Sequence, residues 1–208
     1  MAFLAVCDGH GGRDIVEFLE DGLLYHVSSE MQFEEHDSSN CDGGNASSGH
    51  DNSNNNNNSQ TNPSNDSISA RLERAFLMAD IHSKAMGLTN SGATVAVCVV
   101  TRGNNMYDDT AFTTNQKTND TDANENRDNT WTIYAANAGD ARIVLGHAGK
   151  AHRMTRDHRT DDPEEVRRIE ESGGFIFKGR VLGILAVTRS LGDHCMKEYV
   201  SNSTICYR

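Results

Sequence analysis

The sequence predicts an α+β fold built on antiparallel sheet. Three segments with helical periodicity stand among at least seven short segments typical of β-strands. Several strand segments follow one another with short glycine turns between them, which favours hairpins over a parallel, doubly wound sheet. With 208 residues, the chain is long enough for one domain with a hydrophobic core.

Composition narrows the classes of function. The net charge is −11 at pH 7, which argues against a general nucleic-acid binder and suits a protein that recruits cations. The hydrophobic fraction is only 36%, because two tracts rich in Asn, Ser, Thr and Asp dilute it. These tracts, at about 34–66 and 102–129, predict low-complexity insertions within the domain. No apolar run approaches the roughly 18–20 residues of a membrane span, so we expect no membrane partner.

The five cysteines form an odd, scattered set without a closely spaced pair. Neither a zinc site nor a disulfide framework is therefore expected. Cys7 and Cys98 lie in apolar runs and are typical of small core residues. Reduced thiols predict a cytoplasmic or nuclear location, and we expect a monomer.

The first strand segment, residues 3–7, leads into the sequence DGHGG at 8–12. The glycines permit a tight turn that would leave Asp8 and His10 at the mouth of a sheet. A carboxylate is a ligand for hard cations, and a histidine transfers protons near neutral pH. An ordinary strand-to-helix loop, with an aspartate cap and a surface histidine, explains these residues nearly as well.

Two helices and a strand are expected next. Residues 13–27 repeat apolar side chains at helical spacing, with acidic residues in the first turn. Residues 69–86 show a second apolar face, and Gly87 is a plausible C-terminal stop. The β-branched run at 95–100 predicts a fully buried strand.

An antiparallel meander is expected over 131–154. Its strands are 131–137, 141–145 and 150–154, joined by glycine turns. The first of these turns carries Asp140, in a setting much like that of Asp8.

A third helix is expected to begin after Asp162, because Pro163 suits the first helical position and acidic residues follow it. The helix should end at glycines 173–174. A short strand at 175–177 and an apolar segment at 180–187 follow.

Several of these segments, in this order, resemble the type 2C family of metal-dependent protein serine/threonine phosphatases, and fungal members most. A single DGHGG is a weak signal, whereas the ordered set is specific. The six blocks are FLAVCDGHGG (3–12), SGAT (91–94), AANAGDAR (135–142), TRDH (155–158), RIEESGG (168–174) and LAVTRSLGD (185–193).

The resemblance implies an α-β-β-α sandwich of two antiparallel sheets flanked by helices. It also implies hydrolysis of phosphoserine and phosphothreonine in phosphoprotein substrates, with two Mg²⁺ or Mn²⁺ ions and a third ion at a weaker site. By the resemblance, Asp8 bridges the metals, Gly9 binds one through its carbonyl and His10 protonates the leaving oxygen. Asp140 resembles the residue of the third, weaker metal site.

The chemistry agrees with these roles. Two hard cations lower the pKa of a bridging water and neutralise phosphate charge. A serine or threonine alkoxide is a poor leaving group, so a general acid is needed. No cysteine lies in a phosphate-cradling loop, so a cysteine nucleophile is not expected.

Other charged residues have structural uses as well as functional ones. For the four arginines of these and neighbouring segments, structural ion pairs are favoured over contacts with substrate phosphate. Asp157 and His158 are expected to tie a turn together, and Asp193 is as readily structural as functional. The arginines are Arg142, Arg156, Arg180 and Arg189.

Blocks that supply further metal ligands in the family do not occur in this sequence, before Asp8 or towards Arg208. We therefore expect residues 1–208 to be an incomplete type 2C domain, interior to a longer one. The alternative is a catalytically inactive fragment or pseudophosphatase that acts as a binding module.

Overall fold

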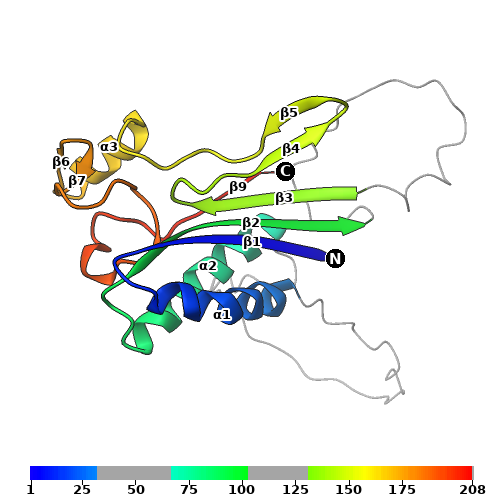
Figure 1. Ribbon diagram of the computed structural model, residues 1–208, viewed down its shortest axis with the longest axis horizontal. Coiled ribbons are helices and arrows are strands. Elements are labelled where there is room, and N and C mark those ends of the chain that lie inside the picture. The colour runs from blue at the N-terminus through cyan, green and yellow to red at the C-terminus, as the bar shows by residue number, and fades with distance from the viewer. Residues whose placement is uncertain (32–66, 103–130, 208) are drawn as a thin grey trace, which may run out of the picture.

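The computed structural model describes residues 1–31, 67–102 and 131–207 (Figure 1). The expected insertions at about 34–66 and 102–129 lie outside these residues, apart from Arg102, which ends a strand. Their prediction is therefore not tested by the structure.

The predicted α+β class with antiparallel sheets is confirmed. A five-stranded sheet has the order β1-β2-β3-β9, and β8 pairs with the start of β2. Two hairpins, β4-β5 and β6-β7, form separate sheets. The sheet strands are β1 (Ala2–His10), β2 (Gly92–Arg102), β3 (Trp131–Ala138), β8 (Leu191–Gly192) and β9 (Ile205–Tyr207). The hairpin strands are β4 (Val144–His147), β5 (Lys150–Arg153), β6 (Ile176–Phe177) and β7 (Arg180–Val181).

Besides these strands, the described residues form three α-helices and a short 3₁₀ helix. Figure 1 shows α1 and α2 together on one side of the central sheet, and α3 near the β6-β7 hairpin. Among the described residues, no helix is long and apolar enough to cross a membrane. The helices are α1 (Asp14–Met31), α2 (Ile68–Ala85), α3 (Pro163–Glu171) and the 3₁₀ helix His194–Met196.

The main core lies between α1, α2 and one face of the central sheet. Leu72 and Phe76 of α2 are fully buried there, as are Val97 and Tyr134 of the sheet. On β1, Leu4 and Val6 remain 65% and 64% exposed. Their alternation with the half-buried Phe3 and Cys7, which pack on the core, shows that the helices cover one face of this strand.

The predicted start of α3 is confirmed, because the Asp162 carboxylate accepts a hydrogen bond from the Glu164 amide. Helix α2 begins at Ile68, one residue before the expected start, and the Ser67 hydroxyl caps it by accepting a hydrogen bond from the Ala70 amide. Helix α1, in contrast, continues one turn beyond the expected end at residue 27. Val27 and Met31 are both buried in the main core, so the apolar face of the helix continues through its last turn.

The predicted three-stranded meander is wrong. Strand β4 begins at Val144 and pairs with β5, not with β3. The Asn137 side chain explains the break, because its amide nitrogen donates to the carbonyls of Gly139, Ala141 and Arg156. These bonds hold the chain in an open turn, so residues after the turn leave the sheet.

Candidate functional site

Strand β1 does not end where its apolar run ends. It pairs with β2 through Asp8, Gly9 and His10, opposite Thr94, Ala93 and Gly92 respectively. The predicted turn comes later, at Gly11 and Gly12, whose φ angles are 72° and 153°. Asp8 and His10 therefore belong to a hydrogen-bonded strand, which holds them more rigidly than a loop would.

Gly9 is needed for space and not for an unusual backbone conformation. A Cβ at this position would lie 2.3 Å from Cγ2 of Val16 in α1. The glycine thus lets the first turn of α1 pack directly against the end of β1.

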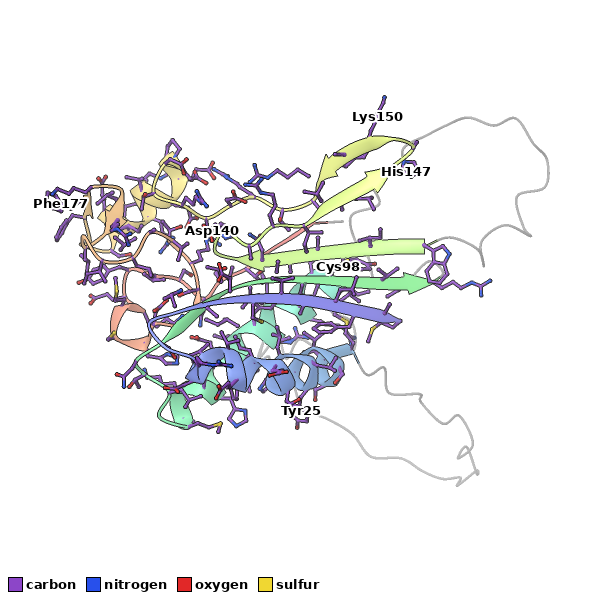
Figure 2. All side chains as sticks on the ribbon, in the orientation of Figure 1. Tyr25, Cys98, Asp140, His147, Lys150 and Phe177 are labelled. Carbon is purple, nitrogen blue, oxygen red and sulfur yellow. The ribbon has the colours of Figure 1, made fainter. Side chains whose placement is uncertain are left out.

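Asp8 and Asp140 lie at the same end of the central sheet. Asp8 is opposite Thr94, and a Cβ on Gly139 would lie 2.5 Å from the Thr94 Cβ. Asp8, Thr94 and the turn before Asp140 therefore form a row across three strands, roughly 10 Å wide at the usual strand spacing. Figure 2 labels Asp140 beyond the end of β3. The structure thus brings the predicted acidic residues to one region.

His10 is paired with a residue from the far end of the sequence. Its Nε2 lies 2.7 Å from Oδ2 of Asp193, and their side chains are 29% and 11% exposed. The Ser190 hydroxyl donates to the same carboxylate oxygen at 2.5 Å. Burial alone would raise the pKa of Asp193, but the hydrogen bonds from His10 and Ser190 outweigh it and hold that pKa below its usual value.

The backbone around Asp193 is built to hold this carboxylate. Asp193 is in the left-handed region at φ 48°, and its amide donates to the Ser91 carbonyl at 3.0 Å. A Cβ on Gly92 would lie only 2.3 Å from Asp193 Oδ2. The carboxylate therefore lies against the bare backbone of β2, beside the residue paired with His10.

Helix α2 fixes the same segment from the other side. Asp80 accepts a hydrogen bond from the Gly192 amide at 2.8 Å, and Lys197 Nζ lies 3.1 Å from its carboxylate. Lys197 also donates to the Ser190 carbonyl at 2.7 Å. Asp80 is 4% exposed, so this anchor is well shielded from solvent.

Asp140 is held by an arginine. Arg159 reaches its Oδ2 through NH2 at 2.7 Å and Nε at 3.0 Å. Two hydrogen bonds join the neighbouring Gly139 to His158. The Gly139 amide donates to Nδ1 of His158 at 3.1 Å, and the His158 amide donates to the Gly139 carbonyl at 2.9 Å. His158 therefore ties the turn together, as the sequence predicted.

We expect His158 to make the protein less stable in mild acid. Its side chain is fully buried, and burial lowers its pKa to about 4, helped by the charge of Arg189. The unfolded chain, with a histidine pKa of about 6.5, then binds more protons between these values, so stability falls as the pH drops through that window. The loss should approach about 3 kcal/mol near pH 4, measured by urea unfolding across a pH series.

A His158→Asn variant is the control for this effect. Asparagine keeps a hydrogen-bond acceptor near the position of Nδ1 and does not titrate. Between about pH 6.5 and 5, where most carboxylates contribute little, the variant should show a flatter stability curve. Equal slopes for the two proteins would show that His158 is not the titrating group.

Three of the four arginines named from the sequence form ion pairs. Arg142 pairs with Asp157 through a bidentate contact, Arg156 with Asp162 and Glu164, and Arg189 with Glu165. Arg180 instead donates to the Ile184 carbonyl at 2.7 Å.

A cavity of about 440 Å³ lies beside α3. It is lined by Arg142, Arg153, Arg156, Asp157, Arg159, Asp161, Asp162 and Pro163.

The donors near Asp8 suit a hard cation in type but not in number. Thr94 Oγ1, on the strand opposite Asp8, is buried without a hydrogen-bond partner among the described residues. Oxygen donors of this kind fit Mg²⁺ or Mn²⁺. Within residues 1–31, 67–102 and 131–207, however, no group of three His, Cys, Asp or Glu residues is placed to hold a metal ion. A closed site would need carboxylates in addition to Asp8.

Cys7, next to Asp8, does not offer a nucleophile. Burial raises the pKa of its thiol to about 11, so the reactive thiolate is scarce at neutral pH. This agrees with the expectation of a core cysteine without a catalytic role.

The sequence did not single out the buried residues Asp80 and Glu165, and it left the role of Asp193 open. Glu165 is 3% exposed and accepts hydrogen bonds from Thr188 and Arg189. Their hydrogen-bond partners lie far away in the chain, so no local sequence pattern marks these contacts. The sequence signal was that Thr188, Arg189 and Asp193 belong to the same family-like block.

Comparison with known proteins gives a consistent family. The model of the family described as "Protein phosphatase 2C" matches residues 1–206. "Protein phosphatase 2C homolog 1" of Saccharomyces cerevisiae is 40% identical over 136 residues, which cover 64% of this chain and 43% of the yeast protein. Its namesake in Schizosaccharomyces pombe is 54% identical over 69 residues, covering 33% and 20% of the two chains. The chain thus spans less than half the length of these relatives.

A solved structure supports the fold. The crystal structure of serine-threonine phosphatase 2C from Toxoplasma gondii superposes with a TM-score of 0.60 over 98% of this chain and 62% of that chain. At 14% sequence identity this likeness is evidence for the fold alone. The fold, the ordered sequence blocks and the family match over residues 1–206 together show that the chain belongs to the protein phosphatase 2C family.

Proposed function

We propose that this protein acts as a metal-dependent phosphatase that removes phosphate from phosphoserine and phosphothreonine in proteins. One observation carries the proposal furthest: the strand of Asp8 also presents His10, hydrogen-bonded to a carboxylate at 2.7 Å. A metal-binding carboxylate and a proton donor, two residues apart on one face of a strand, suit hydrolysis of a phosphate ester.

The family is metal-dependent, and we propose Mg²⁺ or Mn²⁺ for this member too. Asp8 and the Gly9 carbonyl would bind two such ions, with Asp140 at a third, weaker position. When bound, the ions would activate water and neutralise phosphate charge. Within the described residues, no third His, Cys, Asp or Glu joins Asp8 to close such a site.

His10 supplies the proton in this proposal. Hydrolysis of a phosphoserine or phosphothreonine ester expels an alkoxide, which leaves readily only when its oxygen is protonated. The His10 ring is partly exposed to solvent, and its Nε2 is held by Asp193. It can therefore meet a substrate without losing its orientation.

A direct assay tests the proposal. The purified protein should hydrolyse a phosphothreonine peptide when Mn²⁺ or Mg²⁺ is added, and EDTA should stop the reaction. Absence of metal-dependent hydrolysis, with correct folding confirmed by circular dichroism, would contradict the proposal and favour the binding-module alternative, which the comparisons do not support.

We propose a monomer in the cytoplasm or nucleus that contacts neither nucleic acid nor membrane. The free thiols of Cys7, Cys98 and Cys195 suit a reducing compartment. Size-exclusion chromatography with light scattering would test the oligomeric state.

A further inference from the structure

We propose that Asp193 is a positioning residue for His10, and that it makes Nδ1 the ring nitrogen that exchanges the proton with the substrate. The proposal deepens the function above and rests on it. It concerns a residue whose role the sequence left open, and it follows from contacts that join positions 183 residues apart.

The first step is the assignment of the ring nitrogens. Nε2 of His10 lies 2.7 Å from Asp193 Oδ2, and an ionised carboxylate only accepts hydrogen bonds. The proton of the neutral ring must therefore be on Nε2. Nδ1 then carries the lone pair in the neutral ring and the transferable proton in the charged ring. No hydrogen bond engages Nδ1 within the described part of the chain.

The carboxylate that accepts from His10 is oriented by a second hydrogen bond. The Ser190 hydroxyl donates to Oδ2 of Asp193, which fixes the carboxylate independently of His10. The carboxyl remains ionised at neutral pH, because its pKa lies below the usual value despite burial. A carboxylate that orients a histidine and selects its tautomer is a recurrent device in enzyme sites.

The backbone and neighbours of Asp193 hold the carboxylate in place. Asp193 is in the left-handed backbone region, its amide donates to the Ser91 carbonyl, and its carboxylate lies against Gly92, where a Cβ would be only 2.3 Å from Oδ2. The adjoining Gly192 amide is bonded to the buried Asp80 of α2. The pair is thus supported by β2 and α2, as a positioning contact needs to be.

The tautomer can be measured without any reaction. With ¹⁵N-labelled histidine, long-range ¹⁵N–¹H correlation spectra of the purified protein at alkaline pH distinguish Nε2–H from Nδ1–H rings. We expect neutral His10 to be in the Nε2–H form. In Asp193→Asn, the side-chain amide competes as a donor to Nε2, so the Nδ1–H form should increase. An Nδ1–H ring in the unmutated protein, or an unchanged ring in the variant, would overturn the proposal.

Kinetics supply a second readout. Asp193→Asn should slow Mn²⁺-dependent hydrolysis of a phosphothreonine peptide by about 10²-fold or more in kcat. Hydrolysis of p-nitrophenyl phosphate should fall less than about tenfold, because p-nitrophenolate leaves without protonation. His10→Gln should show the same contrast, and combining the two changes should add little. Equal losses on both substrates would indicate a merely structural role and would overturn the proposal.

Two controls separate the possible failures. Asp21→Asn, which changes an exposed carboxylate of α1, should alter neither the ring nor the rates. If the unmutated protein hydrolyses neither substrate, the proposed function fails, while the tautomer measurement still decides the role of Asp193. If Asp193→Asn does not fold, the tautomer of the unmutated protein and the substrate contrast of His10→Gln decide it.

Discussion

Replacing Asp8 by asparagine is expected to reduce Mn²⁺-dependent hydrolysis of a phosphothreonine peptide by about 10³-fold or more. A neutral amide oxygen binds a hard cation much more weakly than a carboxylate does, and the loss of several kcal/mol of charge stabilisation corresponds to this factor. Asp8 is the carboxylate that the structure places on β1 beside His10. The measurement is kcat/KM, together with calorimetric titration of the protein with Mn²⁺.

The fold should survive this change. Asp8 is exposed at the end of β1, and asparagine has nearly the same size, so the free energy of unfolding should change by less than about 0.5 kcal/mol. The matched control is Asp14→Asn, an exposed carboxylate in the first turn of α1. If Asp8→Asn retained full metal-dependent activity, Asp8 would not be a metal ligand.

Replacing Glu165 by alanine is expected to lower the free energy of unfolding by about 3–5 kcal/mol. The Glu165 side chain is 4% exposed and accepts hydrogen bonds from Arg189 at 2.5 Å, Arg168 at 3.1 Å and Thr188 at 2.8 Å. Its removal leaves two partly buried guanidinium groups without their anion, which costs more than the pair itself contributes. Urea unfolding followed by circular dichroism measures the change.

The neighbouring Glu164 is the matched control. Its side chain is 67% exposed and pairs with Arg156 at 2.7 Å. Glu164→Ala should cost less than about 1 kcal/mol, because solvent screens an exposed ion pair. Similar losses in the two variants would show that the buried network around Glu165 is not a special source of stability.

Acid titration gives a further test of Glu165. Burial alone would raise its pKa, but the hydrogen bond and charge of Arg189, with Thr188 and Arg168, lower it to about 2. Because the unfolded carboxyl titrates near pH 4.3, the unfolded chain binds more protons between these values. The stabilisation, about 3 kcal/mol, is present above pH 5 and disappears as the pH falls towards 2. Glu165→Ala should lack this part of the pH dependence.

The sequence alone was sufficient where the signal is local. The cap at Asp162 with Pro163 marked the start of α3, because a cap acts within one helical turn. The helical spacing of apolar residues over 69–86 predicted one buried face, and the fully buried Leu72 and Phe76 lie on it. The ordered blocks around Asp8 and Asp140 indicated the family. The register of β1 and β2 and the turn after β3 place both aspartates at one end of the sheet.

The tertiary structure decided what depends on distant partners. The sequence expected a strand after Asp140, but the side chain of Asn137 holds the turn and turns the chain away from the sheet. It expected β1 to stop before Asp8, but backbone pairing with β2 carries the strand to His10. It left Asp193 undecided, because a hydrogen bond between residues 183 positions apart leaves no periodic trace in the chain. The residue type sets what a side chain such as His10 can do chemically. The partner that orients it, Asp193, comes within hydrogen-bond distance only when the sheet and α2 pack together.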